Sequence, residues 1–322
     1  MDGRLHYGLS NGDNYLNIAR DLAFYNAKNE EITTRDGHVK GYIVDVRAFA
    51  DSAGALSTAT IPNTWRMRNS FRRFHFARDL MFDQAGVTKE ERGKYGQTLR
   101  PHFSPKSQKD GYVVPQLLHI NDAVTSPDPQ DLTGGEWTYS SLASSPTLKD
   151  KKVDGTEMVA KDLDLALVDE WELTVLGESQ SDDDYDGVKI WKSVGMIHAY
   201  NTDRQAPIPD SDSTNYPGSS IQATNNPLAS LMTQTLTSGE IAEIAKEQEE
   251  EKPPYDITNV GDSINAVYDL NAYMAATGEA ATRRLGQIFV PAGLMYLNWT
   301  GDTDKLTLDL NVVGVVLCKD MA

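Results

Sequence analysis

The sequence predicts a mainly β protein, an antiparallel β-sandwich with a few helices in its loops and insertions. Three observations support this prediction. Apolar and polar residues alternate from Leu306 to Val312, which is the period of a strand with one face on a core and the other in water. Other runs are rich in β-branched and aromatic residues and are bounded by turn sequences. Helical patterns are few, and they lie between those runs.

The stretch 286–319 indicates the element that closes the sandwich. Its first half, 287–299, is rich in β-branched and aromatic residues, and Pro291 and Gly293 interrupt it as a bulge would. Residues 300–304 contain no apolar side chain and have turn chemistry. We therefore expect two long strands joined as a hairpin at the C-terminal end of the sheet.

The end of this hairpin loses its alternation. Val315, Val316 and Leu317 are consecutive apolar residues, which predicts a strand covered on both faces. The single cysteine, Cys318, follows them in the same strand, so the chain has no internal disulfide framework. Its apolar neighbours predict a buried thiol without chemistry.

Residues 1–37 are expected to form a lead and a helix that precede a sandwich domain over 38–322. Asn11 or Asp13 can cap a helix that runs to about Ala27. Its apolar residues are spaced three or four apart, at Tyr15, Ile18, Leu22 and Tyr25. From Val39 to Ala50 the pattern predicts a strand with apolar residues on both faces, and therefore covered on both sides.

The region 63–84 is the most distinctive chemically. We interpret it as the start of a strand that passes into a helix. In the alternative, the whole region is a helix with Asn63 or Thr64 as its cap. Five arginines lie there against two aspartates, a local excess of positive charge: Arg66, Arg68, Arg72, Arg73 and Arg78. A short helix is expected to follow from a capping-box pattern over 88–91. The aromatic residues of 63–84 are assigned to the core.

Farther along the chain, strand patterns recur at 112–119, 136–142, 163–176 and 189–200. Turn sequences separate them, a spacing typical of a sandwich or jelly roll. The composition then shifts to a polar and helical excursion at about 201–284. An excursion of this length between core strands usually serves an interface, a lid or a surface.

Charge and hydropathy restrict the partners. The formal charge is −17, with 47 acidic and 30 basic residues, so nucleic acid must meet a local patch if it binds at all. The first residues lack the apolar segment of a signal peptide, and no run of about 18 apolar residues occurs. We expect neither secretion nor a membrane span.

Enzyme signatures are mostly missing, so no catalytic residue and no cofactor are predicted. No two of the six histidines have the spacing of a common metal motif. The segment 182–187 matches the first half of a calcium loop, but Ser193 stands at position twelve instead of a bidentate glutamate. The favoured interpretation is a solvated acidic hairpin tip. The alternative is a calcium ion at subunit contacts, held by Asp182, Asp184 and Asp186.

The arginine cluster has two interpretations. The guanidinium groups can contact phosphates and displace counterions, which makes binding salt-dependent. They can equally pair with carboxylates of this chain or of a neighbouring subunit while stacking on aromatic rings.

Several short motifs, taken in their order, resemble the capsid proteins of small circular single-stranded DNA viruses, the smacovirus-like and related environmental types. The resemblance covers roughly 39–322 and rests on the segments 135–139, 169–177, 226–228, 253–256 and 290–294. It implies an eight-stranded jelly roll whose copies assemble into an icosahedral shell around a single-stranded DNA genome. It also implies a virion location, assembly inside the host cell, and a homo-oligomeric partner.

The sequence departs from many such proteins because it starts with mixed charge and has no arginine-rich arm. Packaging would then rest on the 66–78 arginines, on cations or on another protein. Three competing interpretations stay open, and one of them is an enzyme on the same fold. A double-jelly-roll coat protein of a tailless phage would need about sixteen strands. A carbohydrate-binding β-sandwich would expose aromatic side chains in a groove.

Overall fold

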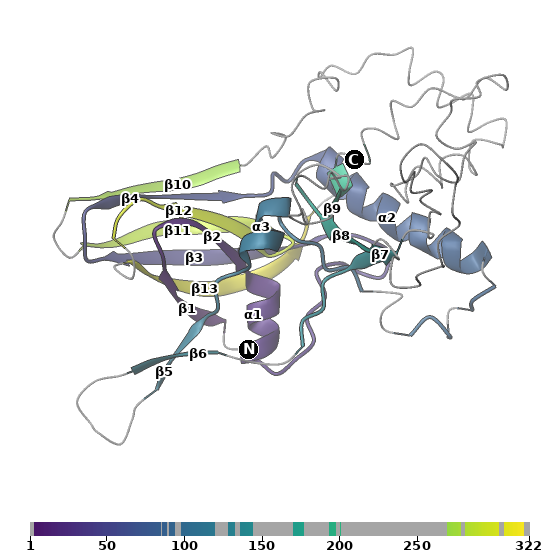
Figure 1. The fold of residues 1–322 in the computed structure, drawn as a ribbon, viewed down its shortest axis with the longest axis horizontal. Helices are drawn as coiled ribbons and strands as arrows, with labels where there is room; N and C mark the ends of the chain where they lie inside the picture. Colours follow the sequence, from purple (N-terminus) through teal and green to yellow (C-terminus); the bar gives the residue numbers. More distant parts are fainter. Residues whose placement is uncertain are drawn as a thin grey trace, which may run out of the picture.

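Two antiparallel sheets are the main feature of the computed structural model (Figure 1). The structure describes residues 3–84, 86–88, 90–93, 98–119, 128–132, 136–143, 170–176, 193–197, 200, 269–277, 281–302 and 306–318. Sheet A has the order β11-β3-β13-β1-β5-β6, and sheet B has the order β10-β4-β12-β2. The prediction of a mainly β, sandwich-like protein is confirmed.

Eight strands build the sandwich, and β5 and β6 extend sheet A beyond β1. The bounds of the eight are β1 (Arg4–Leu9), β2 (Gly12–Asn17), β3 (Lys40–Ala50), β4 (Gly54–Thr60), β10 (Asp269–Ala276), β11 (Ala281–Pro291), β12 (Leu294–Trp299) and β13 (Leu306–Leu317). The first of them pairs with the last, β1 with β13, and the second with the last but one, β2 with β12. In the same nested manner β3 pairs with β11 and β4 with β10.

The core lies between the facing sides of the two sheets. In β3, alternate residues are buried from Tyr42 to Ala50, and in β13 Leu306, Leu308 and Leu310 are buried against them. Trp299 is fully buried from sheet B. Each large apolar side chain removed from water in this way contributes roughly 1.5–3 kcal/mol.

The remaining elements lie between β4 and β10 in the chain, except α1 (Ile18–Tyr25). They are α2 (Trp65–Gln84), α3 (Pro105–Asp110), β5 (Gln116–His119), β6 (Asp128–Asp131), β7 (Ser141–Ala143), β8 (Glu170–Thr174) and β9 (Ser193–Gly195). Strands β7, β8 and β9 form a small third sheet. Figure 1 shows α2 beyond one end of the sandwich and the β5–β6 ribbon projecting from it.

The expected lead and helix over 1–37 contain two strands of the sandwich. Residues 4–9 and 12–17 are β1 and β2, so the helix expected from Asn11 or Asp13 is wrong in its first half. The helix begins at Ile18, and the Asn17 side chain caps it by accepting from the Arg20 amide. The helical spacing of 11–17 does not decide the structure there. Pairing with β12 gives hydrogen-bond partners to the backbone groups of β2 that face it.

The expected closing hairpin is also wrong. Where a bulge was predicted, Ala292 and Gly293 form a turn with positive φ (56° and 71°), and the chain leaves sheet A for sheet B. Strand β12 therefore pairs with β2 and β4, whereas β13 pairs with β1 and β3. The two strands lie in different layers and form no hairpin.

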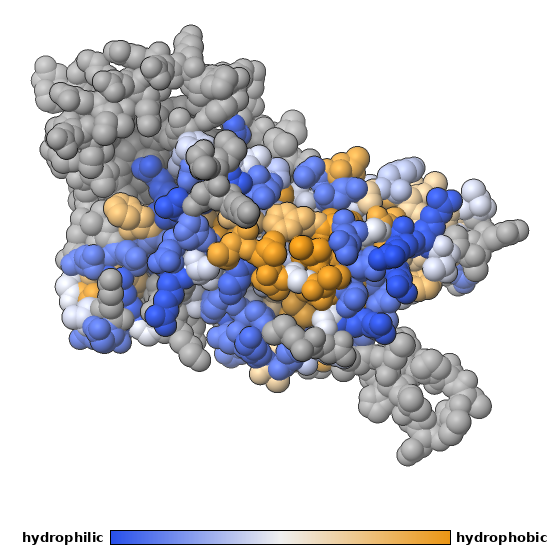
Figure 2. All heavy atoms as spheres, turned by 180° about the vertical axis from the view of Figure 1, so that it is seen from behind, coloured by the Kyte–Doolittle hydropathy of each residue, from blue (hydrophilic) through white to orange (hydrophobic). Residues whose placement is uncertain are grey.

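The prediction that β3 and the end of β13 are covered on both faces is wrong as well. Val315, Val316 and Leu317 are exposed, and so is Phe49 on the outer side of β3. Cys318 is buried as predicted, just after β13. Figure 2 shows apolar side chains gathered in one area of the face seen there, bordered by hydrophilic ones.

Other expectations change in detail. Within the described residues, the strand expected over 112–119 is limited to 116–119, that over 136–142 to β7, and that over 189–200 to β9. Residues 90–93 are turn, not helix. The excursion expected at 201–284 includes β10 and the start of β11. Its predicted helices, and residues 163–169, lie outside the described residues.

Candidate nucleic-acid and subunit contact surface

Helix α2 carries the five arginines that the sequence singled out, and it is helical from Trp65, with no strand start. Thr64 caps it, because the Thr64 hydroxyl accepts from the Met67 amide at 3.3 Å. Its inner side is apolar, and Met67, Phe71 and Phe74 are buried in the core. The spacing of three and four residues gives the helix one docked face and one outer face.

Two of the five arginines serve the fold. Arg68 is only 6% exposed, and its guanidinium donates to the backbone oxygen (3.1 Å) and side-chain oxygen (2.9 Å) of Asn63. Arg78 donates to the Thr98 carbonyl at 2.7 Å and lies over the Phe74 ring. These two guanidinium groups hold segments on either side of α2, so we remove them from the candidate contact surface.

The other three lie nearer the solvent. Arg72 is exposed, whereas Arg66 and Arg73 are half-buried. Trp65 (37% exposed) and Phe76 (65% exposed) are on the outer side as well, although the sequence assigned both to the core. A guanidinium between exposed aromatic rings suits phosphates and stacked bases, and it suits carboxylates on another subunit equally.

The two acidic residues Asp79 and Asp83 of α2 share one arginine from outside the helix. Arg92 contacts Asp79 at 2.9 Å and Asp83 at 2.5 Å, and its guanidinium lies 5.1 Å from the centre of the Phe82 ring. Sequence reasoning missed this arginine, because it lies in the turn after the helix. With both carboxylates paired, the outer side of α2 is more positive than its sequence alone indicates.

His75 stays neutral on the inner side of α2. Its Nδ1 is 3.0 Å from an Arg78 nitrogen, which can only donate, so Nε2 carries the proton and donates to the Thr33 hydroxyl at 3.0 Å. Burial, together with the charge of Arg78, lowers the pKa of His75 to about 4. This histidine therefore joins α2 to the turn before β3 and adds no charge to the surface.

A second polar cluster is buried at the N-terminal end of α1, and no sequence motif predicted it. The Tyr7 hydroxyl donates to Asp21 at 2.6 Å, and Arg20 donates to the other Asp21 oxygen at 2.7 Å. Arg20 also donates to the Val113 carbonyl at 2.7 Å. Three separate segments supply the members of this cluster, so no spacing along the chain could reveal it. Its contacts join β1, α1 and the segment before β5.

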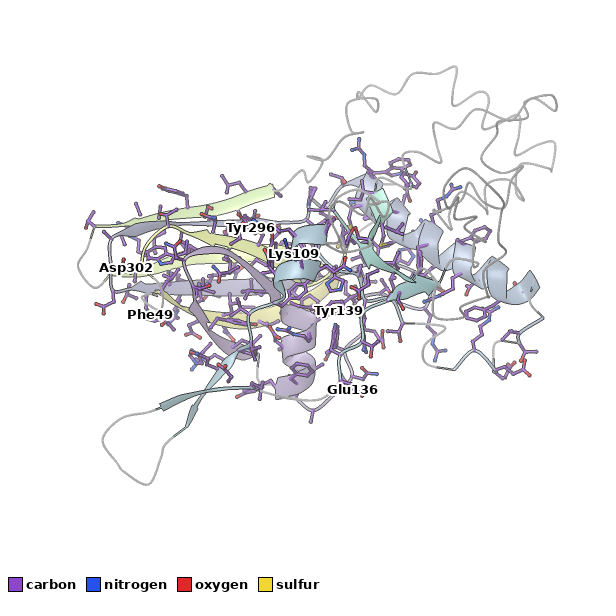
Figure 3. The ribbon with its side chains drawn as sticks, viewed as in Figure 1. Phe49, Lys109, Glu136, Tyr139, Tyr296 and Asp302 are labelled. Carbon is purple, nitrogen blue, oxygen red and sulfur yellow. The ribbon has the colours of Figure 1, made fainter. Side chains whose placement is uncertain are left out.

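Stacked rings continue this cluster. The rings of His102 and Tyr139 lie 3.7 Å apart between centres, and Tyr112 stacks on Tyr139 at 5.5 Å. His102 Nε2 lies 2.6 Å from a Glu172 carboxylate oxygen, although the two are poorly aligned for a hydrogen bond. Tyr139 lies beside α1 in Figure 3, and its hydroxyl accepts from Asn17 at 3.3 Å. These contacts tie the β7–β8 region to the sandwich.

Metal and thiol chemistry find little support in the described part of the chain. Among those residues, no group of three or more histidine, cysteine, aspartate or glutamate side chains could hold a metal ion. Asp182, Asp184 and Asp186 lie outside the described residues. Burial raises the pKa of the Cys318 thiol to about 11, so it remains protonated and a poor nucleophile at neutral pH.

Comparison with known proteins gives no relative: no family model, no curated protein and no solved structure matches the chain. In the described residues, the model contains no helix with the length and apolar character that crossing a membrane requires.

Proposed function

We propose that the chain is a viral coat protein, that its sandwich is an eight-stranded jelly roll, and that its copies assemble into an icosahedral shell around single-stranded DNA. The observation that carries this proposal is the nested strand pairing. In chain order the eight sandwich strands pair first with eighth, second with seventh, third with sixth and fourth with fifth. No catalytic role is part of the proposal.

Nested pairing is the signature of a ribbon that has been rolled up. Strands β1 to β4 form one half of a long antiparallel ribbon, and β10 to β13 form the other half. Successive segments of the ribbon alternate between the two sheets, and the pairs β13–β3 and β12–β4 join neighbouring turns of the roll. This arrangement supports a jelly roll, which occurs in viral capsid domains and also in lectin domains.

Fold alone does not decide between a coat protein and a binding module. The long connection between β4 and β10 favours the coat protein. It carries α2, α3 and the third sheet outside the eight-stranded layers, and Figure 1 shows α2 beyond one end of the sandwich. Such an appendage offers a surface for a neighbouring copy, as closed symmetric assemblies require.

The charge distribution favours nucleic acid as cargo. Subunits of charge −17 repel one another and repel DNA, except where cationic groups reach the surface. Arg72, flanked by exposed Trp65 and Phe76 on α2, is such a place. We assign the outer side of α2, with Arg66 and Arg73, to contact with DNA or with an adjacent subunit.

Electron microscopy of the purified recombinant protein over a salt and calcium series tests the proposal. We expect closed particles of uniform diameter, and an absorbance ratio at 260 and 280 nm that reports nucleic acid. Calcium enters the series because Asp182, Asp184 and Asp186 can hold a lattice ion. A monomer or small oligomer under all conditions would refute the coat-protein assignment and direct the search to ligand screens.

A further inference from the structure

The outer face of sheet A carries a row of polar and charged residues that the sequence did not single out. Strand register places five side chains side by side across five strands: Arg284 (β11), Arg47 (β3), Asp309 (β13), His6 (β1) and Gln116 (β5). In β1, β3 and β13 the alternating neighbours of the row are buried in the core, so the row faces outward. Neighbouring strands lie about 4.8 Å apart, so the row spans roughly 20 Å.

The row contains an arrangement that costs stability. Arg284 and Arg47 are directly opposite each other in an antiparallel pair. Like charges at such positions destabilise a sheet. Arg47 is opposite Asp309 on its other side, and Arg284 is bonded to Asp45. An anion bound between the two guanidinium groups would remove the repulsion that remains.

Two carboxylates, Asp45 and Asp309, lie on this face of the sheet. Asp45 accepts from Arg284 Nε at 2.8 Å, and Asp309 lies 3.6 Å from His6 Nδ1. Arg47 and Arg4 are exposed, and neither makes an ion pair or hydrogen bond with the described residues. Arg4 is opposite Asn311, one outward position along β1 from His6. The guanidinium groups of Arg4 and Arg47 therefore remain available to a ligand.

An aromatic ring lies on the same face. Phe49 is 41% exposed and sits one outward position along β3 from Arg47, roughly 6.8 Å away. Guanidinium groups that follow a phosphate backbone, combined with an exposed ring on which a base can stack, are the elements of single-strand recognition. A purely acidic protein partner would not need the ring.

We infer that the outer face of sheet A binds single-stranded nucleic acid, with phosphates on Arg4, Arg47 and Arg284 and a base stacked on Phe49. This inference deepens the proposed function and rests on it for its biological role. The site is separate from α2, because Phe49 lies toward the end of the sandwich opposite that helix (Figure 3). A strand of nucleic acid would thus meet the sheet as well as the helix.

Fluorescence anisotropy of a labelled oligo-dT with the full chain, over a salt series, tests the inference. Arg47→Gln and Arg4→Gln should weaken binding, and each should lower the slope of log affinity against log salt by about 0.7. Phe49→Ala should weaken binding several-fold and leave the slope unchanged, since stacking releases no counterions. Arg35→Gln is the matched control, an exposed arginine in the turn before β3 that should change neither quantity.

Thermal unfolding separates binding from folding. Arg47→Gln removes both the repulsion by Arg284 and the attraction to Asp309, so its melting temperature should stay close to that of the parent protein. Weaker binding that only accompanies a lower melting temperature would refute the inference. Unchanged affinity and unchanged salt slope in both arginine variants would also refute the inference. A preference for poly-glutamate over oligo-dT would refute it as well and would identify an acidic protein partner.

The two proposals fail in different ways. Particles that retain their DNA in the Arg4→Gln, Arg47→Gln double variant, with unaltered oligo-dT binding, would overturn the sheet A site and leave the coat-protein assignment intact. Arginine-dependent binding of oligo-dT by a protein that never assembles would support the site and overturn the coat-protein assignment.

Discussion

The Tyr7 hydroxyl donates a 2.6 Å hydrogen bond to Asp21, and both side chains are fully buried. Tyr7 comes from β1 and Asp21 from α1, so this contact fixes the helix against the edge of the sandwich. Burial raises the pKa of Tyr7 well above its ordinary value, which keeps the hydroxyl protonated as a donor. The contact is a point at which stability can be tested directly.

Tyr7→Phe should destabilise the protein by about 1–3 kcal/mol. The change keeps the ring but leaves a buried carboxylate oxygen without its donor. Urea unfolding measures the effect. Tyr296→Phe is the matched control, because Tyr296 donates to the more exposed Asp13 at the same distance, 2.6 Å. A larger loss in the control than in Tyr7→Phe would contradict the assignment of Tyr7–Asp21 as the stronger anchor.

Asp21 should make stability depend on pH in an unusual direction. Desolvation by burial, partly offset by Arg20 and Tyr7, raises the pKa of Asp21 from 3.8 to about 6. The folded state therefore binds the proton more tightly than the unfolded state. This group's contribution is fully present below pH 4 and is lost as pH rises through 6, by on the order of 2–3 kcal/mol.

Unfolding free energies between pH 4 and 7 check this expectation. The unfolding free energy of the parent protein minus that of Asp21→Asn should fall from pH 4 to pH 7 and stay constant above pH 7. The difference isolates Asp21 from Arg20 and Tyr139, which face it and are present in both proteins. A difference that rises with pH would show that Asp21 has a lowered pKa and would refute the account.

Replacement of Arg72 and Arg73 by Glu should leave the fold intact and abolish assembly or DNA packaging. Arg72 is exposed and Arg73 is half-buried on the outer side of α2, so the unfolding free energy should change by less than about 1 kcal/mol. Particle yield by microscopy and the 260/280 nm absorbance ratio are the measurements. Particles that match the parent in number and DNA content would remove α2 from the contact surface.

Arg68→Gln, on the same helix, should give the opposite result: a less stable protein with unchanged DNA content. Arg68 is buried, and its two bonds to Asn63 hold the start of α2. We expect a loss of about 1–3 kcal/mol in unfolding free energy from the unpaired acceptors. Any particles that form at low temperature should have parent-like DNA content. A stable variant with reduced DNA content would place Arg68 on the contact surface instead.

Two glycines, Gly301 just after β12 and Gly314 in β13, should respond differently to alanine. A Cβ at Gly301 would lie 2.1 Å from the fully buried Trp299 ring and 2.8 Å from the Ala53 carbonyl, so Gly301→Ala should cost about 1–3 kcal/mol. Gly314 has open space around it and no positive φ, so Gly314→Ala should be neutral or slightly stabilising. Thermal unfolding of both variants measures the contrast. Equal melting temperatures would contradict the close packing at Trp299.

Some of the architecture could be predicted because it is written in local periodicity. The alternation over Leu306 to Val312 identified β13 and its buried side, and the pattern after Val39 identified β3. The arginines of α2 were located correctly on a helix. In each case the period assigns residues to a face, and burial of that face is the main stabilising effect.

Strand β1 also has a period-two pattern in the sequence. Leu5, Tyr7 and Leu9 alternate with polar or small residues and are all buried in β1. The run is short, and the helical spacing after Asn11 masked the next strand. A period of two over six residues competes poorly with a longer helical pattern when only the sequence is considered.

Local patterns in the chain were enough to predict a mainly β protein, the buried side of β13 over Leu306 to Leu310, and the position of the α2 arginines. The tertiary structure alone decided that β12 and β13 lie in different sheets, that Arg284 faces Arg47, and that Asp21 meets Tyr7. The reason is physical. Side-chain periodicity encodes a face, but strands pair through backbone groups that every residue shares, so partners far apart in the chain are selected only when the whole core packs.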